Sequence, residues 1–309
     1  MSSLAIVFPG QGSQSVGMLS DIAAEFPSVQ SVFAEASDAL GYDLWELSHS
    51  GPAEKLDSTV HTQPALLAAS YAIWQLLAND LKPAILAGHS LGEYTALVCA
   101  EALSFTDGIK LVAARGAFMQ DACPTGLGAL AAIVGLSDEE VSALCDQVRQ
   151  NDVLSPANFN SPGQVVIAGH ADAVDRAVQN AKAAGAKLAK RLAVSVPSHC
   201  ALMKPAADRL AQQLAQITIQ TPVLPVLNNV DAKLYETPES IRDGLTRQLF
   251  MPVRWVETIQ AFAKQGIKQI IECGPGKVLT GLNKRIAPEI ELQYTADIDQ
   301  LRGVLHVRN

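Results

Sequence analysis

The segment PAILAGHSLGEYTALV, residues 83–98, sets the architecture of this chain of 309 residues. Residues 83–87 have the length and apolar composition of a short buried strand. After the turn, Tyr94, Leu97 and Val98 recur at the spacing i, i+3, i+4, as residues on one face of a helix do. A strand, a G-x-S-x-G turn and a helix in this order predict a nucleophile elbow with Ser90 at its tip.

The chemistry of an elbow depends on its backbone. A serine on a sharp turn is pushed out of the sheet, and the amide that follows it, Leu91 N–H, points to the place where an oxyanion would form. Gly88 and Gly92 remove the side chains that would crowd the turn. Small residues also gather in ordinary strand-to-helix turns, so the motif alone leaves a purely structural interpretation open.

The composition excludes several classes of protein. Apolar residues make up 49% of the chain and charged residues 17%, which is typical of a compact folded protein. The net charge of −8, with no long basic tract, argues against a general nucleic-acid binder. No basic region precedes the first apolar run, and no stretch of about 18 apolar residues occurs, so we expect a cytoplasmic protein without a membrane span.

The five cysteines indicate no covalent or metal-bound framework. Their number is odd, their spacing is wide, and no C-x-x-C pair occurs. This pattern favours a reducing compartment and predicts neither a disulfide framework nor a zinc site. We therefore expect no metal.

A second glycine-rich turn follows the first predicted strand, residues 4–8. The turn PGQGSQ, residues 9–14, would place backbone amides against an anionic group, although it lacks the lysine and the spacing of a P-loop. A plain strand-exit turn is the alternative.

The middle of the chain has a different pattern, which predicts a separate unit. Strands are expected over residues 128–134, 153–159, 164–169 and 187–194, and helices over 137–149 and 171–184. The order βαββαβ is that of a ferredoxin-like domain. We expect an α/β protein with a large α/β-hydrolase-like domain on a parallel sheet and this small domain inserted into it. The predicted boundaries are 1–126 and 197–309 for the large domain and 127–196 for the insert.

The large domain is expected to resume after the insert. A helix is predicted over residues 202–217, and strands near 225–228 and over 269–272. The last of these strands enters the turn Gly274-Pro275-Gly276.

A serine hydroxyl is a weak nucleophile near neutral pH and needs a base within hydrogen-bond reach. Among the six histidines, His199 is best placed, because it lies where the chain returns from the insert and sites collect in interdomain clefts. His89 adjoins Ser90, but neighbours in an elbow point to different sides, so His89 is expected to brace the turn. A capping or core histidine is the alternative for His199. The remaining histidines lie in polar, terminal or strand-exit positions: His49, His61, His170 and His306.

No acid stands out as a third member of a catalytic triad. In the usual hydrolase fold an Asp or Glu between the serine and the histidine orients the ring. The acids between Ser90 and His199 mostly belong to predicted helix faces of the insert. We therefore expect a dyad whose histidine is oriented by another group, such as a backbone carbonyl.

Two further residues have two interpretations each. Arg115 is surrounded by apolar residues at helical spacing in the helix predicted over 107–122, so its guanidinium must find an anion. A structural salt bridge is the simpler reading, and a fork for a substrate carboxylate is the functional one. Cys200 adjoins His199, but a buried apolar thiol is the common case and a cysteine nucleophile the rarer one.

An ordered set of motifs carries a family resemblance over residues 4 to 285. The chain resembles the malonyl-CoA:acyl carrier protein transacylases of bacterial fatty-acid synthesis, and the polyketide acyltransferases share most of the set. The motifs that carry it are GQGSQ at 10–14, GHSLG at 88–92, Arg115, NFNSPGQ at 158–164, PSH at 197–199, Gln248 and GPG at 274–276.

The resemblance implies a role for each matching residue. Ser90 would be the acylated nucleophile, His199 its base, and the main-chain carbonyl of Gln248 the group that orients the histidine. Arg115 would grip the free carboxylate of the malonyl group. The remaining implied positions are the oxyanion-hole amides of Gln11 and Leu91 and the cleft residues Gln63, Asn160 and His89.

The resemblance also implies the reactants. Malonyl-CoA would be a substrate rather than a cofactor, and no other cofactor is expected. The partner would be an acidic acyl carrier protein, which must dock on a local basic patch of this acidic chain. The candidates for that patch are Lys187, Lys190, Arg191, Lys204, Lys277, Lys284 and Arg285.

Two other function classes remain open from the sequence. A serine hydrolase or thioesterase would use the same serine, histidine and oxyanion hole with water as acceptor. An inactive scaffold would keep the fold without the reaction. The choice between malonyl and a bulkier acyl group depends on the pocket near Ser198 and His199, where one methyl group is worth only about 1 to 3 kcal/mol.

Overall fold

A parallel sheet of five strands lies at the centre of the computed structural model, which describes residues 3–193 and 196–306. Its strand order is β7-β2-β1-β8-β9, and every neighbouring pair is parallel. The strands are β1 (Leu4–Phe8), β2 (Ile85–Gly88), β7 (Val226–Leu227), β8 (Gln269–Glu272) and β9 (Glu291–Tyr294).

Strand β1 shows why this sheet is buried on both faces. Leu4, Ile6 and Phe8 belong to the large core on one side of the sheet, whereas Ala5 and Val7 belong to a second core on the other side. Successive residues of a strand point to opposite faces, so a strand covered on both sides is continuously apolar. The strand predicted over residues 4–8 is confirmed at both ends.

The helices between β1 and β2 and those after β2 build the large core. Five helices lie between the two strands: α1 (Ser20–Glu25), α2 (Ser28–Leu40), α3 (Leu44–Ser50), α4 (Ala53–Leu56) and α5 (Thr59–Leu77). Two follow β2: α6 (Leu91–Cys99) and α7 (Phe105–Ala122).

The later helices complete both layers. The chain continues after the insert with η1 (Ala201–Met203), α10 (Lys204–Leu214), α11 (Pro238–Gln248), α12 (Trp255–Lys264), α13 (Val278–Ile286) and α14 (Ile298–His306). Residues of α12 and α13 cover the face of the sheet that carries Ala5 and Val7. Among the described residues, no helix combines the length and the apolar character needed to cross a membrane.

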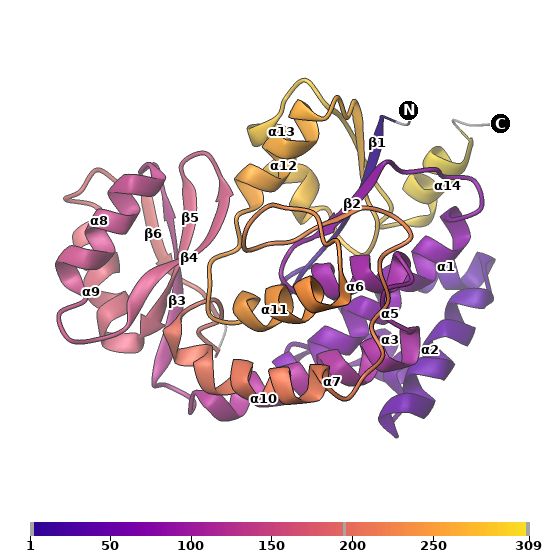
Figure 1. Cartoon of the computed structure of the whole chain (residues 1–309), viewed down its shortest axis with the longest axis horizontal. Helices are drawn as coiled ribbons and strands as arrows, with labels where there is room; N and C mark the ends of the chain where they lie inside the picture. Colours follow the sequence, from indigo (N-terminus) through magenta and orange to yellow (C-terminus); the bar gives the residue numbers. More distant parts are fainter. Residues whose placement is uncertain (1–2, 194–195, 307–309) are drawn as a thin grey trace.

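An antiparallel sheet of four strands forms one end of the molecule (Figure 1). Its order is β4-β5-β3-β6, with one helix after β3 and one after β5. This is the ferredoxin-like arrangement that the sequence predicted. The elements are β3 (Gly128–Val134), α8 (Asp138–Val148), β4 (Leu154–Ser161), β5 (Gln164–His170), α9 (Ala171–Ala181) and β6 (Leu188–Arg191).

The antiparallel unit has a hydrophobic core of its own, formed by residues such as Ile133, Val165 and Val174. It is contiguous in the chain, whereas the parallel sheet takes two strands from before it and three from after it. The predicted fold class, with a parallel sheet and a separate small unit, is therefore confirmed. The domain boundaries at residues 126/127 and 196/197 stay a prediction.

Several predicted ends differ from the structure. The helix predicted over 202–217 is a 3₁₀ turn followed by α10, which stops at Leu214, since the β-branched run of residues 217–219 disfavours a helix. Helix α9 ends at Ala181 rather than 184, before a turn in which Gly185 has a φ of 101°. The strand predicted over 187–194 is β6, and Val194 lies outside the described residues.

Candidate active site

Ser90 lies in a strained turn between β2 and α6. Its φ of 52° and ψ of −105° are unfavourable for a residue with a side chain. A Cβ on Gly88 would lie 1.9 Å from the carbonyl carbon of Gly92, and a Cβ on Gly92 would lie 2.1 Å from the carbonyl oxygen of Phe8. The two glycines of the motif therefore allow the close approach of backbones that holds Ser90 in place.

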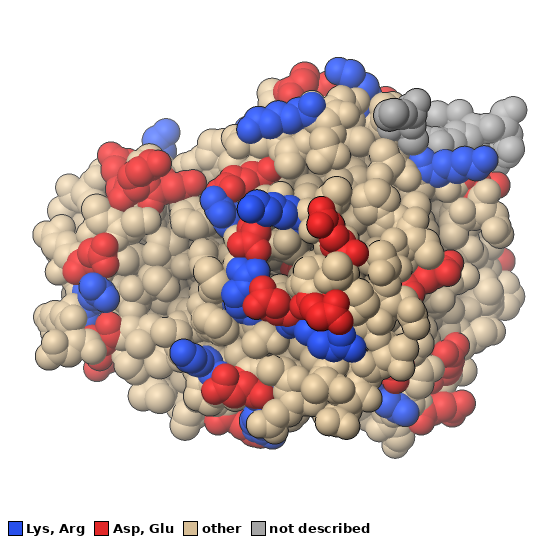
Figure 2. Space-filling model, in the orientation of Figure 1, with Lys and Arg blue, Asp and Glu red and all other residues tan. Residues whose placement is uncertain are grey.

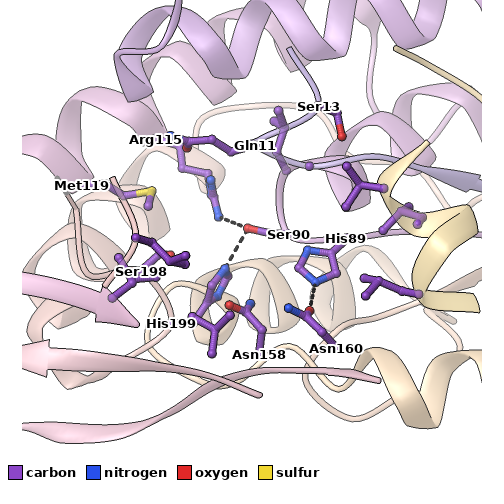
Figure 3. Close-up of a pocket in the computed structure, with 18 residues that line it drawn as sticks. Gln11, Ser13, His89, Ser90, Arg115, Met119, Asn158, Asn160, Ser198 and His199 are labelled. Atoms are coloured by element: carbon purple, nitrogen blue, oxygen red, sulfur yellow. Dashed lines mark hydrogen bonds between the residues drawn. The ribbon is translucent and has the colours of Figure 1, made fainter. Parts of the chain in front are cut away.

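His199 lies within hydrogen-bond distance of Ser90, as Figure 3 shows. The Ser90 Oγ and the His199 Nε2 are 2.8 Å apart. On the other side of the ring, Nδ1 lies 2.7 Å from the main-chain carbonyl oxygen of Gln248. Since a carbonyl only accepts hydrogen bonds, Nδ1 carries the proton and Nε2 accepts from the serine. The expected orientation of His199 by a backbone carbonyl is what the structure contains.

The environment of His199 keeps its imidazole neutral. Burial, followed by the positive charge of Arg115, lowers the pKa of His199 from 6.5 to about 3. A neutral imidazole with a free lone pair on Nε2 can take the proton of the Ser90 hydroxyl. The pair therefore has the protonation state that a serine nucleophile and its base require.

Arg115 is buried, with 2% of its surface exposed, and its guanidinium lies on the other side of Ser90. Nη1 donates to Gln63 Oε1 at 2.7 Å, and Nη2 donates to Gln248 Oε1 at 3.0 Å and to Ser90 Oγ at 3.2 Å. Within residues 3–193 and 196–306, no carboxylate forms an ion pair with it, so the salt-bridge interpretation is not supported. A guanidinium beside a nucleophile and without a carboxylate partner can receive the carboxylate of a substrate.

The pocket in front of Ser90 lies between the two sheets. Gln11 and Leu91 line it from the parallel-sheet side, and Leu130, Asn160 and Val166 line it from the antiparallel sheet. Side chains from both units therefore converge on the serine, as Figure 3 shows. This position agrees with the preference of ligand sites for clefts between structural units.

Two residues that line this pocket have backbone amides without a hydrogen-bond partner in the described part of the chain. Gln11 lies in the turn after β1, and Leu91 is the first residue of α6. The amides at the start of a helix have no intrahelical acceptor. Both are available to a developing oxyanion, as the resemblance implies.

His89 and Asn160 link the elbow to the antiparallel sheet. The His89 Nε2 lies 2.8 Å from Asn160 Oδ1. Burial lowers the pKa of His89, so its ring is neutral. Figure 3 shows His89 pairing with Asn160 while His199 approaches the serine. The pairing of His89 with Asn160 rather than with Ser90 fits the expected bracing role, which stays a prediction.

The other histidines with described side chains have local partners. His49 contacts Ser20, His61 contacts Ser58, and His170 accepts the Val153 amide.

The thiol of Cys200 is an unsuitable nucleophile. It is buried and donates to the carbonyl of Pro197 at 3.2 Å, and burial raises its pKa from 9.0 to about 12. The sulfur is therefore protonated near neutral pH, and the apolar interpretation of Cys200 fits the structure.

Two residues that the sequence analysis did not single out support the elbow and its surroundings through hydrogen bonds. Asn229 accepts the Ser90 amide through Oδ1 and donates to the Gly88 carbonyl through Nδ2, both at 2.7 Å. Glu93 is fully buried and accepts from Gln248 Nε2 at 2.6 Å. An acid inside the otherwise apolar start of α6 was the signal for Glu93. Asn229 follows a predicted strand, and nothing local marks it.

Comparisons with known proteins show the family of this chain. The family model described as "Acyl transferase domain" matches residues 5–290. The malonyl CoA-acyl carrier protein transacylase of Escherichia coli (strain K12) is 58% identical over 289 residues, which cover 93% of each chain. The protein of the same name from Haemophilus influenzae is 55% identical over 307 residues, or 98% of each chain.

Solved structures are equally similar. The crystal structure of an acyl carrier protein S-malonyltransferase from Vibrio cholerae has a TM-score of 0.96 and 56% identity, and the match covers 98% of this chain and all of that one. A malonyl-transacylase in complex with a type II PKS acyl-carrier protein has a TM-score of 0.98 and 54% identity, with 99% and 100% covered. The chain thus belongs to the acyl transferase family and, within it, to the malonyl-CoA:acyl carrier protein transacylases.

Proposed function

We propose that this chain transfers the malonyl group of malonyl-CoA to the phosphopantetheine thiol of acyl carrier protein, with Ser90 as the nucleophile. The observation that carries the assignment is the contact of one serine hydroxyl with two groups. His199 accepts from Ser90 Oγ at 2.8 Å, and Arg115 donates to the same oxygen at 3.2 Å. A base for the hydroxyl and a cation for the substrate carboxylate meet at one atom.

The first half-reaction forms an ester on the serine. The Nε2 of His199 takes the hydroxyl proton as Ser90 Oγ attacks the thioester carbonyl of malonyl-CoA. The amides of Gln11 and Leu91 hold the oxyanion of the tetrahedral intermediate. When the carbon–sulfur bond breaks, the sulfur takes the proton from His199, coenzyme A leaves as a thiol, and malonyl-Ser90 remains.

The second half-reaction reverses these steps with another thiol. His199 removes the proton of the phosphopantetheine thiol, and the sulfur attacks the ester carbonyl of malonyl-Ser90. The same two amides hold the oxyanion, and the serine oxygen recovers its proton as it leaves. Because the acyl donor and the acceptor use one pocket in turn, the kinetics are ping-pong.

Arg115 supplies the preference for a dicarboxylic acyl group in this proposal. Its Nη2 lies beside the atom that is acylated, so the free carboxylate of a malonyl group on Ser90 comes within reach of the guanidinium. Paired donors on a planar cation match the geometry of a carboxylate. Gln63 holds the far side of the guanidinium and leaves the side that faces the pocket for the substrate.

The intact mass of the protein after brief exposure to malonyl-CoA without acceptor tests this function. We expect a single malonyl adduct on the wild type and none on Ser90→Ala, and we expect the carrier to discharge the adduct. Free malonate without a lasting adduct would favour the hydrolase. Neither an adduct nor labelling by a serine-directed phosphonate would favour the inactive scaffold.

We also propose a cytoplasmic location. All five cysteines are free and buried, which agrees with a reducing compartment. The relatives with curated names are bacterial proteins that act on a coenzyme A thioester, as their names state.

A further inference from the structure

One buried carboxylate close to the serine has no part in the reaction steps above. Glu93 lies on α6, one helical turn after Ser90, and its side chain is fully buried. The Glu93 Oε2 accepts from Gln248 Nε2 at 2.6 Å and from the Asn229 amide at 3.2 Å, and Oε1 accepts from the Tyr235 hydroxyl. All three partners donate, so the surroundings fit an ionised carboxylate, which only accepts.

The carboxylate decides how the side-chain amide of Gln248 is turned. The NH₂ group of that amide lies between two acceptors, Glu93 Oε2 and the carbonyl oxygen of Ser90, the latter at 2.8 Å. The amide oxygen then faces Arg115 Nη2 at 3.0 Å. Because a carboxylate cannot donate and a guanidinium cannot accept, the opposite orientation would lose both contacts.

The orientation of Gln248 in turn holds the guanidinium of Arg115. Among the described residues, the amide oxygens of Gln63 and Gln248 accept from the two terminal nitrogens of Arg115, in addition to its contact with Ser90. The guanidinium also lies over the ring of Tyr94, with its central carbon 5.2 Å from the ring centroid. Burial lowers the pKa of Arg115, and first Tyr94 and then the carboxylate of Glu93 oppose this by favouring the cation. Gln248 links Glu93 to the guanidinium, since it donates to Glu93 and accepts from Arg115. The chain of contacts thus runs from Glu93 to Gln248, to Arg115 and to the serine oxygen.

We propose that Glu93 is a positioning residue for the selection of malonyl groups: it fixes the Gln248 amide, which fixes the Arg115 guanidinium beside Ser90. This inference rests on the proposed binding of the malonyl carboxylate by Arg115. Glu93 does not touch the reacting atoms. The ring of His199 is held separately, by the main-chain carbonyl of Gln248. Selection of the acyl group and activation of the serine therefore use different atoms of one glutamine.

The charge of Glu93 gives this arrangement a pH dependence. The titratable and charged groups that face it are Tyr235, Tyr94 on its own helix and Arg115 on α7. Burial raises the pKa of Glu93 from 4.5 to about 7, against the opposing effect of the hydrogen bonds that it accepts. A protonated Glu93 would present a hydrogen to groups that donate. The malonyl preference of the wild type is therefore expected to weaken as the pH falls through about 7.

The test compares the rates of acyl-serine formation from malonyl-CoA and acetyl-CoA, measured by rapid quench and intact mass. Glu93→Gln keeps the size of the side chain and removes its charge. We expect the malonyl-to-acetyl ratio to fall about tenfold, the factor for one hydrogen bond to a charged group. We also expect the ratio to become independent of pH between about 6 and 8, around the pKa of Glu93.

Glu272→Gln is the matched control. Glu272 is the other fully buried glutamate of the described chain, and its carboxylate accepts the amides of Leu279 and Thr280 at the start of α13. It has no contact with Gln248 or Arg115 among its hydrogen bonds. The ratio is expected to stay at the wild-type value in this variant.

If Glu93→Gln folds poorly, the variant Tyr235→Phe tests the role of Glu93 in its place. The Tyr235 hydroxyl donates to Glu93 and lowers its pKa. Without that donor, the pH at which the malonyl-to-acetyl ratio changes should move upward. A residue with a purely structural role would not shift this midpoint.

The outcomes separate the two proposals. Equal losses with both thioesters in Glu93→Gln, or an unchanged ratio, would overturn the role of Glu93 while Arg115→Ala still lost the malonyl preference. An unchanged ratio in Arg115→Ala would overturn the carboxylate clamp itself. A reduced ratio in both variants, with Glu272→Gln at the wild-type value, supports both.

Discussion

The protonation of His199 is set by what surrounds a single ring. Burial and the charge of Arg115 both disfavour the imidazolium, whereas the hydrogen bond to the Gln248 carbonyl favours it, and burial dominates. The ring is fixed by an acceptor without charge, so no buried acid raises its pKa. The sequence offers no suitable acid before His199, and in the structure a backbone carbonyl takes the place that an acid has in a catalytic triad.

We predict that the reactivity of Ser90 is insensitive to moderate acid. A histidine with its usual pKa of 6.5 would be mostly protonated at pH 5, and the rate of serine labelling would drop about thirtyfold from its value at pH 8. With a pKa of about 3, His199 stays neutral over this range, so the rate should stay nearly constant. The rate of serine labelling can be measured with a fluorophosphonate, a reagent that carries no carboxylate. A midpoint near 6.5 would contradict the prediction.

At the scale of elements, local signals predicted the small unit best. The capping box of Ser137 and Glu140 forms at the start of α8, as the sequence indicates. Helix α5 was not predicted, and its environment explains why. Most of its residues are buried and it contains Pro64, so it lacks both the amphipathic period and the composition of a typical surface helix.

The elbow is the element in which the smallest change should have the largest effect. In Gly92→Ala, the new Cβ would lie 2.1 Å from the carbonyl oxygen of Phe8, so β1 and the start of α6 must separate. We predict a loss of about 1 to 3 kcal/mol in the free energy of unfolding, measured by urea denaturation, together with loss of acyl-serine formation.

Gly281→Ala serves as the comparison for this variant. A Cβ at Gly281, inside α13, has no atom within 4 Å. Alanine there should stabilise the protein by about 0.5 to 1 kcal/mol, because glycine weakens a helix interior. Equal stability of the two variants would show that the close approach at Gly92 does not matter.

For the molecule as a whole, the net charge of −8 matters for docking, because the family resemblance implies that the carrier is acidic too. On the face drawn in Figure 2, acidic and basic side chains lie next to one another rather than in separate areas. Helix α13 combines a position at the pocket with basic residues. It lines the pocket with Val278, Leu279 and Leu282. The basic residues Lys277 and Arg285 lie at its two ends. We propose that the carrier docks along this helix.

Charge reversal on α13 tests the docking proposal. The double variant Lys277→Glu with Arg285→Glu should form malonyl-Ser90 at the wild-type rate but transfer it to the carrier several-fold more slowly, with weaker dependence on salt. Lys182→Glu, after α9, is the control and should change neither step. Slowing of both steps in the double variant would indicate a contact with coenzyme A instead.

Features that are encoded locally could be predicted from the amino-acid sequence alone. The elbow follows from two glycines around Ser90, the ferredoxin-like unit from the alternation of its strands and helices, and the family from an ordered set of short motifs. Each is a property of residues that are neighbours in the chain, where periodicity and turn chemistry act.

The contacts between groups that are distant in the chain depend on the folded structure. It placed the Gln248 carbonyl behind His199, left Arg115 without a carboxylate partner, and put Glu93 and Asn229 beneath the serine. Such contacts join elements that lie far apart in the chain and leave no period in the sequence. They form because buried polar groups must find partners, and the packing of both sheets decides which partners are in reach.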